Sequence, residues 1–443
     1  MPSDFLRARA LLLPACAFLV VVPARAEFIY ARLVPGAGIE PNGASSAVDV
    51  SADGRTVVFA SNADNWINDT YTGTRAVAID MDTGVVEVVS QGSNGVFRGE
   101  SPVVSGDGRY VAFLTHNHAL GPNWQVLRKD RATGALELAS ADAAGQPPAG
   151  GTQDNTVSIS ADGRYIAFQS SADLAGSVDG TVPRGSSGII YVKDMQTGQI
   201  EVASVAAGGA TATDCALHRH ALSATGRHLV MTCSGAAVPG ATGGQAYVRD
   251  LQANTTELVS RSSAASAGSS AFVNRPAISP SGRFVSFQTR GYGGLGYANG
   301  VDSTGNSGVY LHDRQTPAAT IPIPRPAAIP ASDYDSCSVS SVSDVGSVLL
   351  SCNYAWTGTG GYPQVFLFVP GAGAPEMLSV AGNQPGNNAS GYSTAVNASG
   401  LSMAWESNAS DIDPDDHNGA SDIFVLVDSS LLEDVIFADG FDG

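Results

Sequence analysis

A short turn built around glycine recurs seven times along the chain, and it constrains the fold more than any other feature of the sequence. The copies read SADGR, SGDGR, SADGR, SATGR, SPSGR, SDVGS and NASGL, and their glycines are Gly54, Gly108, Gly163, Gly226, Gly282, Gly346 and Gly400. Successive glycines lie 54 to 64 residues apart. A period of this length indicates one supersecondary unit per repeat. We therefore expect one structural unit written seven times.

The residues inside each unit have the pattern of β-strands. Alternating β-branched and aromatic residues follow the turn, as in YVAF at 110–113 and YIAF at 165–168, which suits a half-buried strand. A third strand ends in Asp, for example at Asp194, and after a tight turn a fourth strand such as 199–205 completes the unit. The residues before the glycine turn supply the first strand. The prediction is an all-β fold, a seven-bladed β-propeller of four-stranded antiparallel blades.

The strand count also predicts how the ring closes. The first three strands of the unit occur seven times, but only six fourth strands follow their own blades. The segment 28–34 precedes the first glycine turn, as a fourth strand should. We expect this N-terminal strand to pair with the last blade, because closure removes the exposed sheet edges that invite aggregation.

The chain begins with a segment that has the features of a targeting sequence. Arg7 and Arg9 precede an apolar run at 10–22, and the small-residue pattern Ala24-Arg25-Ala26 follows, which predicts a secretory signal peptide at 1–26. Processing as a lipoprotein at Cys16 is the alternative. The run is too short to span a bilayer, and no later stretch is long enough. The expected product is an exported protein, periplasmic or extracellular and not an integral membrane protein, with a propeller at 27–430 and an acidic tail at 431–443.

Four cysteines follow the predicted signal peptide, and their placement indicates two disulfides. Cys215 and Cys233 flank one hairpin turn almost symmetrically, and Cys337 and Cys352 flank another. Such positions face each other on adjacent antiparallel strands. We predict the bonds Cys215–Cys233 and Cys337–Cys352, with four buried free thiols as the alternative.

The charge distribution excludes one class of partner. The formal net charge is −18, and Lys129 and Lys193 are the only lysines. Nucleic-acid binding needs clusters of basic residues that displace counterions, and the sequence contains none. We therefore expect no nucleic-acid partner.

The repeat resembles a known family. The combination of S-x-D-G-R, the following Y-x-A-F and the D-x-x-T-G turn is similar to the WD40-like propeller repeats of TolB-type exported bacterial proteins. The resemblance covers nearly all of 28–428 and implies a propeller fold. It implies no single function, because such blades occur in scaffolds and in the non-catalytic part of prolyl-oligopeptidase-type enzymes. The seven units and the lack of room for an additional α/β domain depart from TolB proteins.

Familiar catalytic motifs are absent from the sequence. It contains no G-x-S-x-G nucleophile turn, no HExxH and no phosphate-binding loop. A pair of carboxylates for glycosidase chemistry is not excluded, because many Asp residues are distributed around the ring. Two histidine pairs, His116 with His118 and His218 with His220, could each chelate a metal with a third ligand, although a loop variant is the simpler interpretation.

One loop is rich in oxygen ligands. The residues Asp413, Asp415, Asp416, Asn418 and Asp422 lie within ten positions around a glycine bend. Calcium takes six to eight oxygen ligands and favours acidic loops of this kind, so calcium is the one possible cofactor. An acidic turn stabilised by Asx hydrogen bonds is the alternative.

Loop lengths indicate a functional face. The turns between strands one and two and between strands three and four are tight, whereas the connections on the opposite face vary in length. Variable loops on a rigid ring are where binding groups usually lie. Four aromatic residues in Gly-rich segments are candidates for stacking on a sugar or holding a peptide: Tyr292, Tyr297, Trp356 and Tyr362.

The sequence as a whole favours a non-catalytic binding or scaffolding module for a protein, peptide or glycan ligand. The alternative is a propeller enzyme, a lyase or glycoside hydrolase, with Asp, His and Arg near the central channel. Convergence of carboxylates and histidines from several blades near the axis would favour the enzyme.

Overall fold

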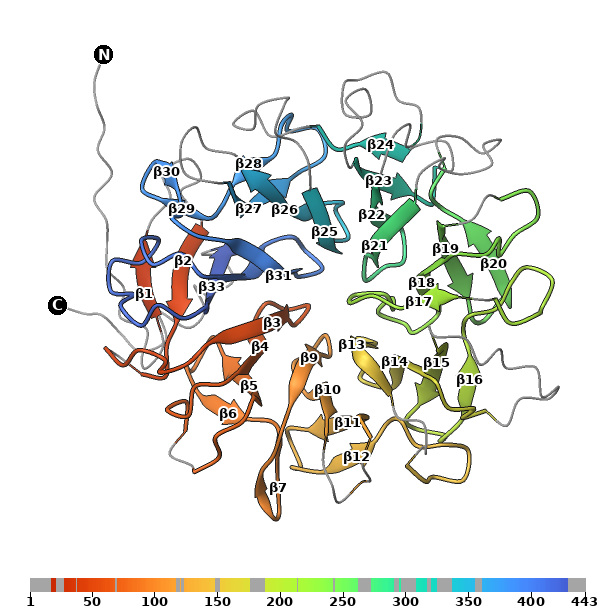
Figure 1. Ribbon diagram of the computed structural model, residues 1–443, viewed down its shortest axis with the longest axis horizontal. Helices are drawn as coiled ribbons and strands as arrows, with labels where there is room; N and C mark the ends of the chain where they lie inside the picture. Colours follow the sequence, from red (N-terminus) through yellow and green to blue (C-terminus); the bar gives the residue numbers. More distant parts are fainter. Residues whose placement is uncertain are drawn as a thin grey trace.

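The computed structural model shows a ring of seven blades (Figure 1). It describes residues 17–20, 28–36, 38–67, 70–116, 120, 123–147, 152–175, 188–212, 214–241, 244–261, 272–290, 295, 308–316, 320–324, 337–354 and 361–428. These residues form strands, turns and loops without any α-helix, so none of their segments is a helix that could cross a membrane.

Each blade is a four-stranded antiparallel sheet whose first strand lies nearest the axis. Blades 1 to 3 are β3 to β6 (Ser45–Val50, Thr56–Ser61, Arg75–Asp80, Val86–Val88), β9 to β12 (Glu100–Val104, Tyr110–Thr115, Gln125–Asp130, Leu136–Leu138) and β13 to β16 (Thr152–Ile159, Tyr165–Ser170, Ile189–Asp194, Ile200–Val202). Blades 4 to 6 are β17 to β20 (Cys215–Ala216, His228–Cys233, Gln245–Asp250, Thr255–Leu258), β21 to β24 (Phe272–Ile278, Phe284–Arg290, Val309–Asp313, Thr320–Pro322) and β25 to β28 (Cys337–Val342, Val348–Tyr354, Tyr362–Phe368, Glu376–Met377). Two small hairpins, β7–β8 (Gln91–Gly92, Gly95–Val96) and β29–β30 (Val380–Ala381, Gln384–Pro385), lie between blades.

The seventh blade closes the ring as predicted. It consists of β31 (Ser390–Val396), β32 (Ser402–Ser407), β33 (Asp422–Asp428) and the N-terminal β2 (Phe28–Leu33). β2 pairs antiparallel with β33, with Phe28 opposite Asp428 and Arg32 opposite Phe424. The predicted seven-bladed propeller and its closure are therefore confirmed. β1 (Ala17–Val20) pairs outside β2 and belongs to the segment expected to be cleaved, so the cleavage at 26 stays a prediction.

Glycine is required at the repeated turn position for two reasons: the backbone has a positive φ angle, and there is no space for a side chain. Gly163 has φ +69°, and a Cβ there would lie 2.3 Å from a ring atom of Tyr110 in the preceding blade. Gly226 has φ +71° and the same relation to Tyr165. The turns also join around the ring, because Gly106 N–H donates to Ala161 O and Ala161 N–H to Ala224 O, both at 2.9 Å. Adjacent blades are thus linked through the turns themselves.

The rest of the turn motif holds each blade together. Arg109 pairs with Asp130 at 2.8 Å, and Arg164 pairs with Asp194 at 2.7 Å, in both cases joining the turn to the end of the third strand of the same blade. The hydrogen bonds from Arg109 hold the pKa of Asp130 at about 2 against the opposing effect of burial. The Arg of the turn and the Asp of the third strand therefore recur together.

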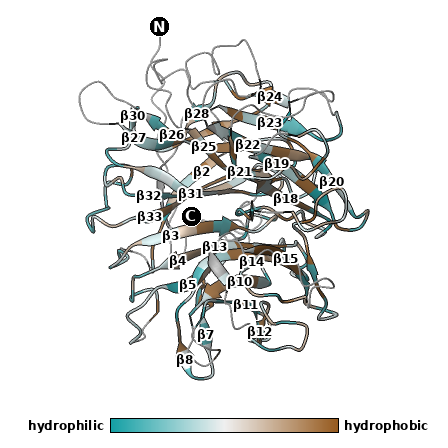
Figure 2. Cartoon of the chain, turned by 45° about the vertical axis from the view of Figure 1, so that its right-hand side comes forward, coloured by the Kyte–Doolittle hydropathy of each residue, from teal (hydrophilic) through white to brown (hydrophobic). Residues whose placement is uncertain are grey.

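The central strands are buried on both faces, unlike the half-buried strands that we expected. All six residues of β4 are buried, including Phe59. The reason is that each blade packs between two neighbours, so neither face of its middle strands meets solvent. Figure 2 shows hydrophobic residues concentrated on these strands.

The cysteines pair as the spacing predicts. Cys215 is bonded to Cys233, and Cys337 to Cys352, and each pair occupies directly opposite positions on adjacent strands.

Candidate functional site

The first strand of most blades contains an irregularity that turns side chains toward the axis. The strand pairing shifts register between Ser46 and Asp49 in blade 1 and between Asn274 and Ala277 in blade 5, and similar shifts occur in blades 2, 3, 6 and 7. Ala47, Ser101 and Arg275 have φ between +47° and +54° at these places. A β-bulge of this kind bends the strand and re-aims a side chain.

The re-aimed positions line one cavity of about 610 Å³ in the centre of the ring. The residue seven positions before each turn glycine lies in its wall, and these residues are Ala47, Ser101, Thr156, Arg219, Arg275, Val339 and Ser393. The wall also includes Asn62 and Thr74, at the connection between strands two and three of blade 1. The cavity therefore opens on the face that carries the variable loops.

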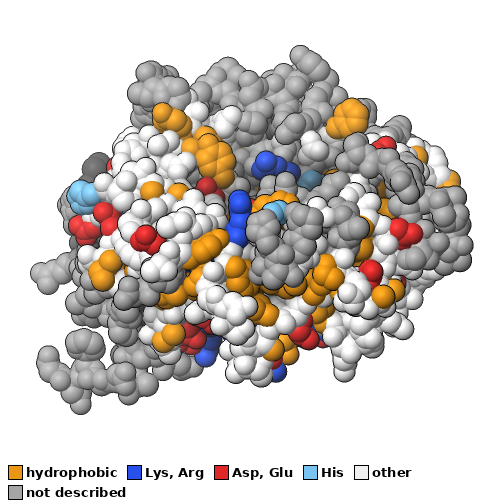
Figure 3. All heavy atoms as spheres, turned by 60° about the horizontal axis from the view of Figure 1, so that its bottom comes forward, with side chains coloured by type: hydrophobic (Ala, Val, Ile, Leu, Met, Phe, Trp, Pro, Cys, Tyr) orange, Lys and Arg blue, Asp and Glu red, His pale blue; other side chains and the backbone are white. Residues whose placement is uncertain are grey.

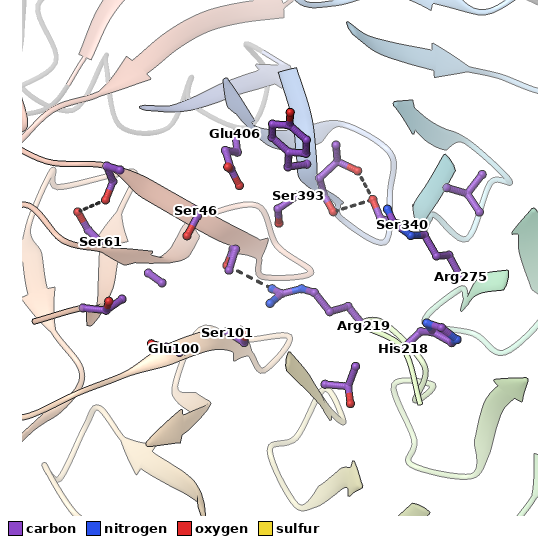
Figure 4. Close-up of a pocket in the computed structure, with 18 of the residues that line it drawn as sticks. Ser46, Ser61, Glu100, Ser101, His218, Arg219, Arg275, Ser340, Ser393 and Glu406 are labelled. Atoms are coloured by element: carbon purple, nitrogen blue, oxygen red, sulfur yellow. Dashed lines mark hydrogen bonds between the residues drawn. The ribbon is translucent and has the colours of Figure 1, made fainter. Parts of the chain in front are cut away.

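Arg219 extends across the cavity from blade 4 (Figure 4). Its Nη2 donates to the carbonyl oxygens of Val48 at 3.1 Å and Pro102 at 2.9 Å, on blades 1 and 2. Its Nε and Nη1 are buried and have no hydrogen-bond partner. A buried guanidinium with unused donors is costly unless a ligand engages them, and a carboxylate has the matching geometry.

A hydrogen-bonded bridge joins blades 1, 4 and 6 beside the cavity. His220 Nε2 lies 3.0 Å from Asp49 Oδ1 in blade 1, and His220 Nδ1 lies 2.6 Å from Ser340 O in blade 6. Although burial raises the pKa of Asp49, the neighbouring His220 and the amide of Val104 bring it below its usual value. The bridge holds the blade 4 strand directly beside Arg219.

Glu406 is one of the two carboxylate side chains, with Glu100, that line the cavity. It lies near the end of β32 in blade 7, is 9% exposed and lines the cavity with Arg219. Burial raises the pKa of Glu406 to about 7, although the Ala47 amide and Arg219 oppose the shift. A carboxylate with this pKa is suited to accept a proton near neutral pH.

His218 and Arg275 complete the polar wall on the side of blades 4 and 5. His218 Nε2 lies 3.1 Å from Thr232 Oγ1, and burial, with Arg275 adding to the effect, lowers the pKa of His218 to about 4. His218 is therefore neutral at physiological pH. Figure 3 shows basic and histidine side chains near the middle of the ring, although the protein as a whole is acidic.

An exposed aromatic residue lies at the cavity. Tyr392 belongs to the wall and is 62% exposed. Of the aromatic residues predicted to bind ligand, Tyr292, Tyr297 and Trp356 lie outside the described residues. Tyr362 begins β27, is 46% exposed and is not among the residues that line the cavity. An aromatic ring at the site is thus present, but at a position that the sequence analysis did not select.

The oxygen-rich loop predicted to bind calcium surrounds an arginine. Arg32 Nε lies 2.6 Å from Asp413 Oδ2, and Arg32 Nη1 lies 3.1 Å from Asp422 Oδ2. Arg32 Nη2 donates to the backbone oxygen of Asp415, and Asn418 Nδ2 donates to Pro41 O. The guanidinium supplies positive charge at the place expected for the metal. Calcium at this loop stays a prediction.

Neither histidine pair forms a metal centre in the described part of the chain. Among those residues, no group of three or more His, Cys, Asp or Glu side chains is placed to hold a metal ion. Both nitrogens of His220 are engaged, and His218 Nε2 is bonded to Thr232. His116 packs edge-on against Trp124, and His118 lies outside the described residues.

The sequence analysis missed the cavity residues because it compared the repeats to find strands. It did not look for positions where one repeat differs from the others in charge. Six residues after the turn glycine the blades carry Ala60, Leu114, Gln169, Thr232, Gln288 and Cys352, but Glu406 in blade 7. Seven residues before the glycine, Arg219 and Arg275 stand among small or apolar residues. A charged residue at a repeat position that is otherwise uncharged was the available signal.

Comparisons with known proteins show the fold. No protein-family model matches the chain, and no curated protein does. A solved oligogalacturonate lyase in complex with manganese is 11% identical, with a TM-score of 0.56 and coverage of 96% of this chain and 100% of that one. An oligogalacturonate lyase from Vibrio parahaemolyticus is 10% identical, with a TM-score of 0.58 and coverage of 95% and 98%. TolB from Acinetobacter baumannii is 15% identical, with a TM-score of 0.40 and coverage of 74% and 61%.

These results bear on two expectations. The manganese of the first lyase has no counterpart that the described residues of this chain could hold, so we derive no step through a metal. The prediction of a non-catalytic binding or scaffolding module is wrong. Charged side chains of blades 2, 4, 5 and 7 line one cavity, and two lyases are among the solved structures that match nearly the whole chain. The chain is a seven-bladed β-propeller.

Proposed function

We propose that this protein is a lyase that cleaves an acidic oligosaccharide in the central cavity by β-elimination. The observation that carries the proposal is Arg219, whose buried Nε and Nη1 lack partners in a cavity that also contains Glu406. An exposed tyrosine, Tyr392, offers a surface for a sugar ring at the same cavity. The lyases that share the fold act, by their names, on oligogalacturonate, which is such a substrate.

The proposed reaction uses each group for a different purpose. Arg219 binds the carboxylate of a uronate residue and stabilises the negative charge that develops when the adjacent C5–H bond breaks. Glu406 accepts that proton, and its raised pKa makes it a stronger base than an ordinary carboxylate. The C5–H electron pair forms the C4–C5 double bond, and the C4–O bond breaks. The leaving oxygen takes a proton from water, and the hydroxide that remains takes the proton back from Glu406, so that the elimination neither consumes nor releases a proton overall.

The test is incubation of the purified protein with oligogalacturonate and with a neutral oligosaccharide of similar length. The expected result is an unsaturated product, detected by its ultraviolet absorbance and mass, from the acidic substrate alone. Glu406→Gln should abolish the reaction, whereas Glu376→Gln, an exposed carboxylate on the outermost strand of blade 6, should not. Hydrolysis to saturated products, or equal cleavage of the neutral oligomer, would contradict the proposal.

We also propose that the protein works outside the cytoplasm. The two disulfides support this location, because such bonds persist in oxidising compartments. Fractionation of producing cells, with N-terminal sequencing of the product, tests both the location and the predicted cleavage after residue 26.

A further inference from the structure

The residues that bring Arg219 into the channel belong to no strand. The first strand of blade 4, β17, pairs with β18 only through its two residues, Cys215 and Ala216, and a single bridge follows at Leu222. The residues between them, 217–221, form the channel segment. The position of Arg219 therefore depends on how the two ends of the channel segment are held.

The backbone conformation around the channel segment needs support from other parts of the protein. Asp214, which precedes β17, has φ +52°, and His220, within the segment, has φ +53°. Residues other than glycine adopt this left-handed conformation at an energetic cost, and they keep it only where the surrounding structure holds them. Contacts at both ends of the segment are thus required for its shape.

The end that precedes the segment is held by a disulfide and by a side chain of blade 3. Cys215 is bonded to Cys233 of β18, and each is 1% exposed. Gln169 of β14 donates from Nε2 to Cys215 O at 2.9 Å and accepts at Oε1 from the Leu217 N–H at 3.2 Å. These contacts fix the backbone four residues before Arg219.

The other end is held by hydrogen bonds to two neighbouring blades. The Leu222 N–H donates to Ser158 Oγ of blade 3 at 3.0 Å, and His220 O accepts from the Ile278 N–H of blade 5 at 3.0 Å. Because the first end has only two ladder positions, we expect the disulfide there to contribute more to the position of the segment than it would beside a regular strand.

The second disulfide provides that regular case in the same molecule. Cys337 and Cys352 form a buried bond at the corresponding place in blade 6, but β25 continues to pair with β26 as far as Val342 and skips only Ser340. The residues that blade 6 contributes to the cavity wall, Val339 and Ser340, are uncharged. Loss of this bond leaves a paired strand in place.

We propose that the Cys215–Cys233 bond, supported by Gln169, positions Arg219, so that the site in the channel is complete only in the oxidised protein. The catalytic consequence rests on the lyase function proposed above. A displacement of about 1 Å in a group that positions substrate can lower a rate by about 10²-fold. A reduced chain would have a closed ring without a working site, and the protein would gain its activity in an oxidising compartment, where such bonds persist.

The test compares two double variants, Cys215→Ala/Cys233→Ala and Cys337→Ala/Cys352→Ala. Each removes one buried bond, and the bonded residues are 18 and 15 positions apart, so both should lower the melting temperature by a similar amount. We expect kcat/KM on oligogalacturonate to fall about tenfold or more in the first variant, whereas the second should keep nearly full activity. Hydrogen exchange of a peptide covering 218–222, measured where both are folded, should become faster in the first variant alone.

A further readout separates displacement of Arg219 from a general loosening of the protein. Arg219 opposes the raised pKa of Glu406, so its displacement should move the inflection of kcat/KM to a higher pH. The inflection should move in Cys215→Ala/Cys233→Ala and stay at the wild-type pH in the variant of blade 6.

Equal losses of activity in the two double variants, or unchanged exchange of 218–222 in the first, would overturn the proposal. If wild type does not cleave oligogalacturonate, the lyase function fails, and the exchange of 218–222 alone still decides whether the disulfide positions the segment. If Cys215→Ala/Cys233→Ala does not fold, Gln169→Leu takes its place, because it keeps the disulfide and removes only the supporting side chain. It should speed exchange of 218–222, unlike Gln288→Leu at the same repeat position of blade 5, and equal exchange in these two variants would overturn the proposal.

Discussion

Two arginines with buried guanidinium nitrogens serve this propeller in opposite ways. Arg219 in the channel has more donors than the protein satisfies, since its Nε and Nη1 lack partners. Arg32 at the ring closure has more carboxylates around it than it can satisfy, since Asp416 is left without a donor. The comparison teaches that unused hydrogen-bonding capacity, and not burial or charge alone, distinguishes the two sites: the channel has spare donors, and the ring closure has spare acceptors.

The largest expected effect is the loss of stability when Arg32 is replaced, and the comparison of the two arginines would fail if stability did not change. Arg32→Met should lower the free energy of unfolding by about 3–5 kcal/mol, because it leaves Asp413 and Asp422 buried without their cation. Urea denaturation measures the change. Arg109→Met, which removes an ion pair with a largely exposed arginine, should have a much smaller effect. Equal effects of the two variants would show that Arg32 is an ordinary surface charge.

Arg219 should show the reverse balance between stability and activity. Arg219→Met should reduce kcat/KM on oligogalacturonate by about 10²–10³-fold, because the developing carboxylate charge loses its donor. Its destabilisation should be smaller than that of Arg32→Met, since only bonds to backbone oxygens are lost. Arg55→Met, at an exposed pair with Asp82, serves as the control and should keep full activity. A large loss of stability with unchanged activity would refute the assignment.

Loss of the His220–Asp49 bridge should have an effect between these extremes. Asp49→Asn removes the carboxylate partner of His220 and should cost about 1.5–3 kcal/mol of stability. Because His220 fixes the turn that carries Arg219, activity should fall, but by less than in Arg219→Met. Thermal unfolding and kcat/KM on the same preparations check both expectations. Activity unchanged from wild type would show that the bridge does not position Arg219.

The smallest effect, and the one that sharpens the comparison most, is the response to pH. Glu406 must be ionised to accept a proton, so kcat/KM should rise about tenfold per pH unit below pH 7 and level off above it. Initial rates from pH 5 to 8 measure this profile. A rate that does not change over this range would show that Glu406 is not the base.

The fold could be predicted because each repeat contains the residues that stabilise its own turn and strands. Gly163 is required because the aromatic side chain of a neighbouring blade leaves no space for a Cβ atom. Arg164 and Asp194 form an ion pair that connects the turn to the third strand. These are local needs that recur in most blades, so they appear as a period in the sequence. The closure could be predicted by counting strands. The last repeat along the chain lacks a fourth strand, and one additional strand precedes the first repeat.

The candidate site could not be predicted in the same way. The calcium prediction was drawn from acidic residues that are close in sequence, but the cation that the structure places among them, Arg32, lies 381 positions from Asp413. His220 and Asp49 meet across 171 positions. Contacts between residues so far apart in sequence leave no local pattern. Glu406 could nevertheless have been noticed, because the other repeats have uncharged residues at the equivalent position.

The sequence by itself determined the seven blades, the order of their strands, the pairing of the ends and the positions of the cysteines, because hydrophobic period, turn chemistry and strand number are properties of neighbours along the chain. Only the tertiary structure decided which side chains face the axis and which charges share a buried volume. Bulges in the first strands re-aim single residues, and a closed ring brings together positions from every blade, so the chemistry of the site depends on distances through space that the order of residues does not contain.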